Sequence, residues 1–290
     1  MENNEILLEL PPNNKKIPFK KYSFKNWDFI SHIGHMMSAN EINEVLLQNN
    51  VLKIKHFPEI FNGYNRLFVI NKENNFVYEF SPFQMLNLTN YEIRKENYDN
   101  KIIYYNPNEV KTKISNSENK NEWTFSSCYM GNICNINNSE IRSLYEDINL
   151  SEKKFKCEID NNIQIPNLGN ETKIKQYIEC ELYEDEFGDN GICETRVRLY
   201  IMEDSFSILL RCYLRVDNII VRNINTNIFY KFGNDFIIRN FSVKEIPYLT
   251  LKNLGFVFRH DWNVYPYQSD QVDQFIKEKI FNITDKIILK

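Results

Sequence analysis

The sequence predicts an α+β fold, a single domain in which antiparallel β-sheet dominates and helices pack around it. Two observations lead to this prediction. Strand-like runs in the C-terminal half are joined by two-residue turn signals, and helical apolar spacing occurs only in short segments. The 290 residues, 42% of them hydrophobic, are enough to bury one large core or two small ones.

The first residues read as a flexible N-terminal tail, 1–17, followed by the domain, 18–290. No basic flank precedes the apolar residues of this tail, so a secretion signal is not expected. No run approaches the roughly 18 apolar residues of a membrane helix. We therefore expect a soluble protein of the cytoplasm, with the nucleus as a second compartment.

Two asparagine-rich zones, near 95–122 and 151–172, look like low-complexity insertions. Short helices are predicted elsewhere. The capping box Ser38–Glu41 opens one of them, Ser139 opens a weaker one, and a C-terminal helix is expected over 269–280.

The strand signals are sharper than the helix signals. Residues 66–70 and 76–80 flank a polar loop and predict a hairpin. Four further runs, joined by the turn signals Asp217-Asn218 and Gly233-Asn234, are residues 206–216, 219–224, 228–232 and 236–241. Runs joined this tightly are antiparallel neighbours, so a meander is expected, preceded by an alternating strand at 196–202.

One face of the predicted meander carries Arg211, Tyr213 and Arg215, which alternate with apolar residues. An antiparallel sheet commonly exposes one face to water, and that is the simpler interpretation. The alternative is a groove for a carboxylate-bearing peptide, because guanidinium groups pair with carboxylates bidentately.

Charge and motifs argue against several functional classes. The 35 basic and 39 acidic side chains, net −4, do not favour nucleic acid or membrane partners. No phosphate loop, dinucleotide motif, G-x-S-x-G or C-x-x-C pair is present. We expect neither an enzyme nor a cofactor. The enzymatic alternative is a metal-dependent hydrolase that uses His32, His35 and the acidic trio Glu184-Asp185-Glu186. The trio does not fit a calcium loop, and a solvated or arginine-paired loop is favoured for it.

Residues 182–222 match a known family without gaps, through LYEDEFGDNG, RVRLYIM and LLRCYLRVDNIIVR. They resemble the Tip-forty-one-like (TIPRL) family of TOR signalling pathway regulators, and EWTFSSCYMG from Glu122 to Gly131 is similar to the family's D-W-T-Y-T-T-D-Y-K-G. The resemblance implies a monomeric, non-enzymatic regulator that binds the catalytic subunit of type 2A-like protein phosphatases. It further implies that a cleft holds the subunit's C-terminal tail and that an alpha-four-like protein acts in the same TOR-linked signalling. A general chaperone-like scaffold remains an alternative.

The candidate partner-binding residues combine the meander face, the acidic trio and the family-like segments. They are Gln84, Trp123, Tyr129, Gly131, Ile165, Glu184, Asp185, Glu186, Arg211, Tyr213, Arg215, Asp217, Arg222, Asn223, Asn225 and Thr226. The chain departs from the family where charged residues are replaced by Gln84, Tyr200, Asn225 and Asn227. Affinity or partner choice is therefore expected to differ from the family pattern.

Overall fold

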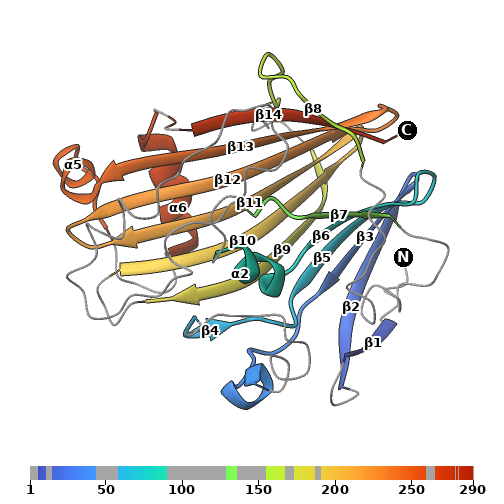
Figure 1. The fold of residues 1–290 in the computed structure, drawn as a ribbon, viewed down its shortest axis with the longest axis horizontal. Coiled ribbons are helices and arrows are strands. Elements are labelled where there is room, and N and C mark those ends of the chain that lie inside the picture. The colour runs from blue at the N-terminus through green and yellow to red at the C-terminus, as the bar shows by residue number, and fades with distance from the viewer. Residues whose placement is uncertain are drawn as a thin grey trace.

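Two antiparallel β-sheets form most of the structure, and the helices are short (Figure 1). The computed structural model describes residues 6–10, 15–43, 58–89, 129–135, 155–166, 173–186, 191–258, 265–277, 279 and 281–289. The predicted antiparallel sheet is confirmed, whereas the helical part of the α+β prediction is minor.

The smaller sheet has six strands in the order β1-β2-β3-β5-β6-β7. These are β1 (Ile6–Leu10), β2 (Lys15–Phe24), β3 (Trp27–His32), β5 (Arg66–Asn71), β6 (Phe76–Phe80) and β7 (Asn132–Asn135). The predicted hairpin is β5–β6, where Asn71 Oδ1 accepts the Glu73 N–H at 2.9 Å within the connecting turn. Residues 6–10 and 15–17, which the sequence placed in a flexible tail, lie in the paired strands β1 and β2.

The larger sheet has eight strands in the order β4-β9-β10-β11-β12-β13-β14-β8. These are β4 (Ile60–Phe61), β8 (Cys157–Ile159), β9 (Ile174–Asp185), β10 (Gly191–Met202), β11 (Ser205–Val216), β12 (Ile220–Lys231), β13 (Phe236–Pro247) and β14 (Phe281–Ile288). The two predicted turns have positive φ, 61° at Asn218 and 94° at Gly233. Asparagine and glycine tolerate this conformation best, which explains where the hairpins close.

The meander contains three strands where the sequence predicted four. The runs 219–224 and 228–232 belong to the single strand β12, which stays extended through Asn225-Thr226-Asn227. Both neighbouring strands supply ladder partners for this stretch, since Asn225 pairs with Arg211 in β11 and with Ser242 in β13. Continuous pairing on both sides outweighs the low strand preference of asparagine.

The two sheets enclose the main hydrophobic core. Val197, Leu199 and Ile201, the predicted apolar face of β10, are fully buried in it. Trp27 of the smaller sheet packs against Phe206 and Tyr230 of the larger one, with ring centroids 5.0 and 4.7 Å apart. Edge-on and tilted aromatic contacts of this kind hold the sheets together beyond the burial of area alone.

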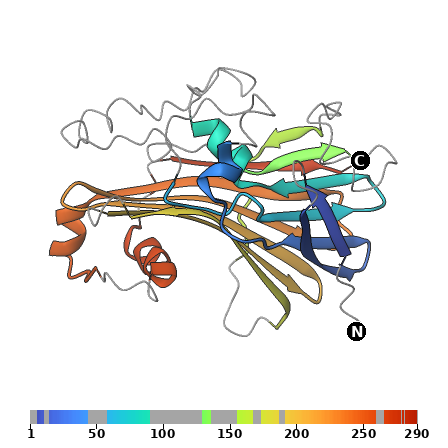
Figure 2. The same cartoon turned by 90° about the horizontal axis from the view of Figure 1, so that it is seen from below.

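The opposite face of the larger sheet carries α5 (Tyr248–Asn253) and α6 (Tyr265–Phe275), as Figure 2 shows. These helices bury a second cluster whose members are Ile192, Tyr213, Val221, Tyr248, Leu251, Phe256, Val272 and Ile276. The predicted C-terminal helix over 269–280 is thus misplaced. It begins earlier, at Tyr265, and ends at Phe275, and residues 281–288 form β14, which lies between β13 and β8.

The predicted capping box is confirmed, because the Glu41 N–H donates to Ser38 Oγ at 3.3 Å and the Ser38 N–H donates to Glu41 Oε2 at 2.9 Å. The predicted helix at Ser139 and the insertion 95–122 lie outside the described residues, whereas residues 155–166 of the second zone are described and include β8. In the described ranges, every helix is too short or too polar to cross a bilayer.

Candidate functional site

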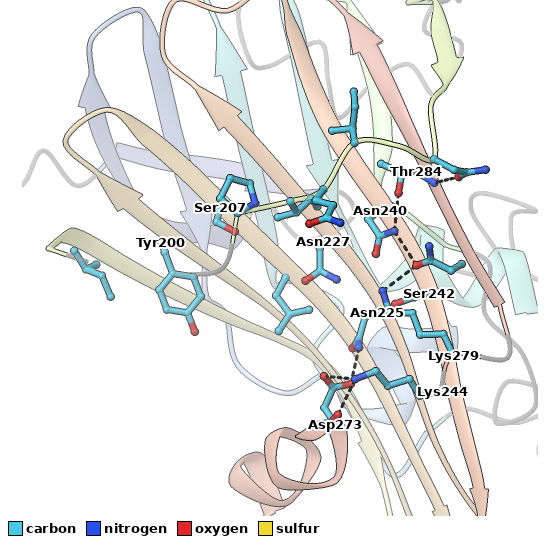
Figure 3. Close-up of a pocket in the computed structure, with 18 residues that line it drawn as sticks. Tyr200, Ser207, Asn225, Asn227, Asn240, Ser242, Lys244, Asp273, Lys279 and Thr284 are labelled. Atoms are coloured by element: carbon cyan, nitrogen blue, oxygen red, sulfur yellow. Dashed lines mark hydrogen bonds and ion pairs between the residues drawn. The ribbon is translucent and has the colours of Figure 1, made fainter. Parts of the chain in front are cut away.

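A polar pocket of about 870 Å³ lies beside α6, on the helix-bearing face of the larger sheet (Figure 3). Strands β11 to β14 form its floor. Asn161, residues 163–166 and Ile174 border it on one side, and Asp273 of α6 and Lys279 border it on another. Strand alternation explains the polar floor, since the residues that point to this face at the middle of the strands are amides, hydroxyls and a lysine: Asn225, Asn227, Asn240, Ser242, Lys244, Asn282 and Thr284.

The floor consists of two rows of laterally paired residues. In one row Asn227 of β12 pairs with Asn240 of β13, which pairs with Thr284 of β14. In the other, Asn225 pairs with Ser242, which pairs with Asn282. Asn240 is held in place by donating to Thr284 Oγ1 at 2.9 Å and to Asn282 Oδ1 at 3.0 Å. The side chain of Asn227 makes no hydrogen bond with any described residue, so both its donor and its acceptor are available to a ligand.

Asp273 of α6 lies at one end of the pocket, inside a ring of donors. Its Oδ1 accepts from Asn225 Nδ2 at 2.8 Å and from Asn223 Nδ2 at 3.3 Å, while Oδ2 lies 2.9 Å from Lys244 Nζ and 3.4 Å from Arg211 Nη2. Burial alone would raise the pKa of Asp273, but the charge of Arg211 and the hydrogen bonds from Lys244 and Asn225 lower it. The carboxylate is therefore ionised at neutral pH and ties α6 to the sheet.

Lys279 projects into the same end of the pocket and donates to Asn282 Oδ1 at 2.9 Å. Burial and then the nearby charge of Lys244 lower the pKa of Lys279, while Asp273 opposes the shift. Lys279, Lys244 and Asp273 thus make this the charged end of the pocket.

The predicted cationic face is not the open surface that the sequence suggested. Arg211 is an ion-pair partner of Asp270 in α6, which also pairs with Arg198 at 2.7 Å. Tyr213 is fully buried beneath the helices. Arg215 is 1% exposed, pairs with Asp217 at 2.7 Å and lies 5.6 Å from the Phe258 ring. The expectation of an exposed arginine and tyrosine dock is therefore wrong, because the chain's own C-terminal helix covers it.

Of the other meander candidates, some are buried in contacts within the chain and one lines the pocket. Arg222 is fully buried and donates through Nε and Nη2 to Glu245 Oε2 at 2.8 and 2.6 Å. Asn223 donates to the Ser269 carbonyl at 2.9 Å, and Thr226 is buried on the other face of β12. Asn225 lines the pocket, as does Ile165.

Three further candidates belong to the smaller sheet and its surroundings, away from the pocket lining. Gln84 is partly exposed on α2 (Pro82–Thr89). The buried Tyr129 hydroxyl accepts the Ser81 N–H at 2.9 Å, which indicates a structural role. Gly131 has φ of 86°, and a Cβ there would lie 2.4 Å from Tyr78 Cε2. Trp123 lies outside the described residues.

The acidic trio ends β9 and contacts the chain itself. Asp185 Oδ2 accepts the Glu59 N–H at 3.0 Å, and Glu184 lies 3.9 Å from Arg196, so the predicted arginine pairing is confirmed for Glu184. Burial, followed by the charges of neighbouring glutamates, raises the pKa of Glu184 to about 7. Glu186 is partly exposed beyond the end of the strand.

The histidine pair of the hydrolase alternative is not arranged as the sequence suggested. His32 ends β3 and is buried, with its ring centroid 5.1 Å from that of Phe19 and 5.7 Å from that of Phe68. His35 follows in a loop, where Nε2 lies 3.0 Å from Glu41 Oε1. In the part of the chain that is described, no three His, Cys, Asp or Glu side chains converge as metal ligands.

Sequence reasoning missed most of the pocket floor. Among the lining residues not anticipated are Ser207, Asn240, Ser242, Lys244, Asn282 and Thr284 of the floor, with Asp273 and Lys279 at its side. The alternating pattern Asn240-x-Ser242-x-Lys244 within a β-rich run was the available signal, since it marks a polar strand face.

Comparison with known proteins identifies relatives. A family model described as the TIP41-like family matches residues 60–252. The TIP41-like protein of Dictyostelium discoideum is 34% identical over 136 residues, which cover 45% of this chain and 46% of that protein. The type 2A phosphatase activator TIP41 of Saccharomyces cerevisiae is 24% identical over 235 residues, 75% of this chain and 60% of that protein. The human TIP41-like protein is 23% identical over 232 residues, with 78% and 76% covered. The chain thus spans about half to three quarters of these relatives.

Proposed function

This chain belongs to the TIP41-like family, and we propose that it regulates a type 2A-like serine/threonine protein phosphatase by binding the catalytic subunit. The name of the yeast relative, type 2A phosphatase activator, supports this class of partner. The proposal includes a non-enzymatic role, TOR-linked signalling with an alpha-four-like protein, a monomeric chain, and action in the cytoplasm and nucleus.

The pocket on the larger sheet supports a peptide-binding mode, and it is the observation on which the proposal depends. An extended peptide offers N–H and C=O groups along its length, and asparagine side chains can both donate and accept. Asn227 presents such groups on β12, whereas the amides of Asn225 and Asn240 beside it already bind Asp273 and Thr284. We propose that the C-terminal tail of the catalytic subunit lies here.

The position of the dock differs from the one inferred from sequence. Arg211 and Arg215 are engaged by Asp270 and Asp217, so an incoming tail would have to break these ion pairs to reach them. The pocket beside α6 needs no such rearrangement, because Asn227 and Lys279 already face its interior.

Binding of a purified catalytic subunit, measured by calorimetry, tests the proposal. Asn227→Trp should fill the pocket and abolish binding, because Asn227 is partly exposed and lines the floor. Asn234→Trp, in the exposed β12–β13 turn, is the matched control and should bind as the parent chain does. Equal melting temperatures for the three proteins would show that folding is intact.

The outcomes separate the alternatives. Unchanged binding by Asn227→Trp would place the partner outside the pocket, and absence of binding by the parent chain would refute the phosphatase proposal. A general scaffold would bind an unrelated unfolded protein about as tightly as the phosphatase, whereas a specific regulator would not.

A further inference from the structure

We infer that the free outer edge of β9 binds an extended segment of another protein in which basic residues alternate with apolar ones. The segment would add one strand to the larger sheet, and its basic side chains would meet a group of glutamates. This edge is separate from the pocket, because Ile174 is the one residue of β9 among the described residues that line the pocket. The inference goes beyond the proposed phosphatase binding and does not depend on it.

β9 is longer than the strand that covers its outer edge. On its inner side, β10 pairs with it from Ile174 to Asp185. On its outer side, β4 pairs only with Tyr183 and Glu184, and no other described residue continues the ladder toward Ile174. Figure 1 accordingly shows β4 beside the C-terminal end of β9. An unpaired edge of this kind presents N–H and C=O groups on which a further strand can form.

One hydrogen bond shows which backbone groups of β9 point outward. The Glu181 carbonyl accepts from Asn65 Nδ2 at 2.7 Å, and Asn65 follows β4 on the outer side. Backbone direction repeats every second residue along a strand, so the N–H and C=O groups of Glu179 and Tyr177 also point outward. Within the described ranges their one contact is local, from Gln176 Nε2 to the Tyr177 carbonyl at 3.2 Å. These groups are therefore available to an incoming strand.

The side chains along this edge carry more negative than positive charge. Glu179 and Glu181 lie on the helix-bearing face, and their side chains are 33% and 42% exposed. Arg196 of β10 lies 3.4 Å from Glu179 and 2.5 Å from Glu181. Arg198 lies 3.3 Å from Glu179 but is shared with Asp270 of α6, at 2.7 Å. Each arginine is thus divided between carboxylates, and the glutamates at the edge remain partly exposed.

A buried glutamate behind this edge adds to the excess of negative charge. Glu194 of β10 is 2% exposed, and its Oε1 lies 2.6 Å from Arg196, but its Oε2 has no hydrogen-bond partner among the described residues. Glu184 lies directly opposite Glu194 on β9. Burial first, and then the charges of Glu194 and Glu181, raise the pKa of Glu184. Like charges directly opposite one another destabilise a sheet, so a cation bound at this edge would reduce the repulsion.

The geometry of the edge sets the pattern of the incoming segment. A strand added antiparallel, as β10 and β4 are, has the same side-chain face and backbone direction as β9 at directly opposite residues. A basic residue opposite Glu179 would therefore lie beside Glu179 and Glu181, where guanidinium and carboxylate groups pair well. Its neighbours would point to the other face, where the half-buried Ile178 lies. An acidic strand would be repelled, so the edge selects its partner by charge.

The first experiment uses a fluorescent peptide with blocked ends, in which arginine alternates with valine. Fluorescence polarisation should show that the parent chain binds it about fivefold or more tightly than the analogue with glutamate in place of arginine. Two backbone-methylated isomers then test strand pairing. Methyl groups on the arginine nitrogens should abolish binding, because those N–H groups would face β9. Methyl groups on the valine nitrogens should leave binding intact.

The second experiment changes the charge of the edge. Glu179→Gln combined with Glu181→Gln should weaken binding of the arginine peptide about fivefold, because two opposite charges are lost. Glu158→Gln, on β8 at the other border of the larger sheet, is the matched control and should bind as the parent chain does.

Tyr177→Pro tests the backbone edge on the protein itself. Proline removes the outward N–H but not the ladder with β10, and edge strands tolerate proline for that reason. The variant should lose binding, whereas Tyr177→Ala, which keeps the N–H, should retain most of it. Equal melting temperatures would show that both variants are folded. If Tyr177→Pro melts at a lower temperature, the methylated peptides decide.

The results distinguish this inference from its rivals. Equal binding of the arginine and glutamate peptides, or of the two methylated isomers, would overturn it. A dimer of the parent chain in analytical ultracentrifugation that Tyr177→Pro dissociates would mean that a second copy occupies the edge instead. The phosphatase catalytic subunit should bind the parent chain and these variants equally, and loss of that binding in Tyr177→Pro would contradict the separation of edge and pocket. Failure of the catalytic subunit to bind the parent chain would refute the proposed function alone.

Discussion

Asn225 of β12 and Asp273 of α6 are joined by a hydrogen bond of 2.8 Å, from Nδ2 to Oδ1. Asn225 also accepts from Arg211 Nε at 2.8 Å, so one amide links the helix, the middle strand and its neighbour. This network explains why the cationic face is closed where the pocket begins. These residues hold α6 against the sheet. For any variant of them, the free energy of unfolding must therefore be measured together with the binding affinity.

Arg215→Glu is expected to destabilise the chain strongly. Arg215 is 1% exposed and its Nε lies 2.7 Å from Asp217 Oδ1, so the variant would place a buried carboxylate next to Asp217 in place of its counter-charge. Breaking a buried pair in this way typically costs ~3–5 kcal/mol. A urea titration would measure the loss, with the exposed Lys252→Glu as control. An unchanged midpoint for Arg215→Glu would show that the arginine is not structural.

Glu184 should make stability decline as pH rises. Burial first, and then the charges of Glu194 and Glu181, raise its pKa from 4.5 to about 7. The unfolded chain therefore releases this proton at lower pH than the folded chain does, and stability falls between about pH 4.5 and 7. Glu184→Gln should remove this part of the slope in urea midpoints measured at pH 5 and pH 8. Glu203→Gln, at an exposed site, should retain it.

His32 should have the opposite effect in acid. Burial and then the charge of Arg66 lower its pKa from 6.5 to about 3. As pH falls from 6.5 toward 3, the imidazole binds a proton in the unfolded chain but not in the folded chain, so the free energy of unfolding decreases progressively. His32→Phe keeps an aromatic ring between Phe19 and Phe68 and should flatten the acid limb of a thermal melting series. If the limb is unchanged, other groups cause it, and the exposed His35→Gln serves as the reference.

Two glycines with similar backbone angles should respond differently to alanine. Gly131 and Gly233 have φ of 86° and 94°. Alanine is less stable than glycine in this left-handed conformation, so each variant should lose about 1–2 kcal/mol of unfolding free energy. A Cβ at Gly131 would also lie 2.4 Å from the Tyr78 ring, whereas nothing lies within 4 Å at Gly233. Gly131→Ala should therefore lower the melting temperature clearly more than Gly233→Ala. Equal losses would mean that the Tyr78 ring moves aside freely.

The sequence by itself determined the local features of this protein. Alternation of apolar residues identified β10 and β11, and Asn218 and Gly233 marked where their neighbours turn, because side-chain direction and backbone sterics act within a few residues. The family-like stretch from residue 182 indicated the family for the same reason, since it is read directly from the chain.

Only the tertiary structure decided which polar face of the sheet stays open. Arg211 meets Asp270, and Asn225 meets Asp273, across separations of 59 and 48 residues. Strand alternation sorts residues into two faces but does not say where a distant helix will dock. Because Val272 of α6 and Ile276 just after it are buried against one half of the face, the helix covers the arginines there and leaves the asparagine rows beside it as the pocket.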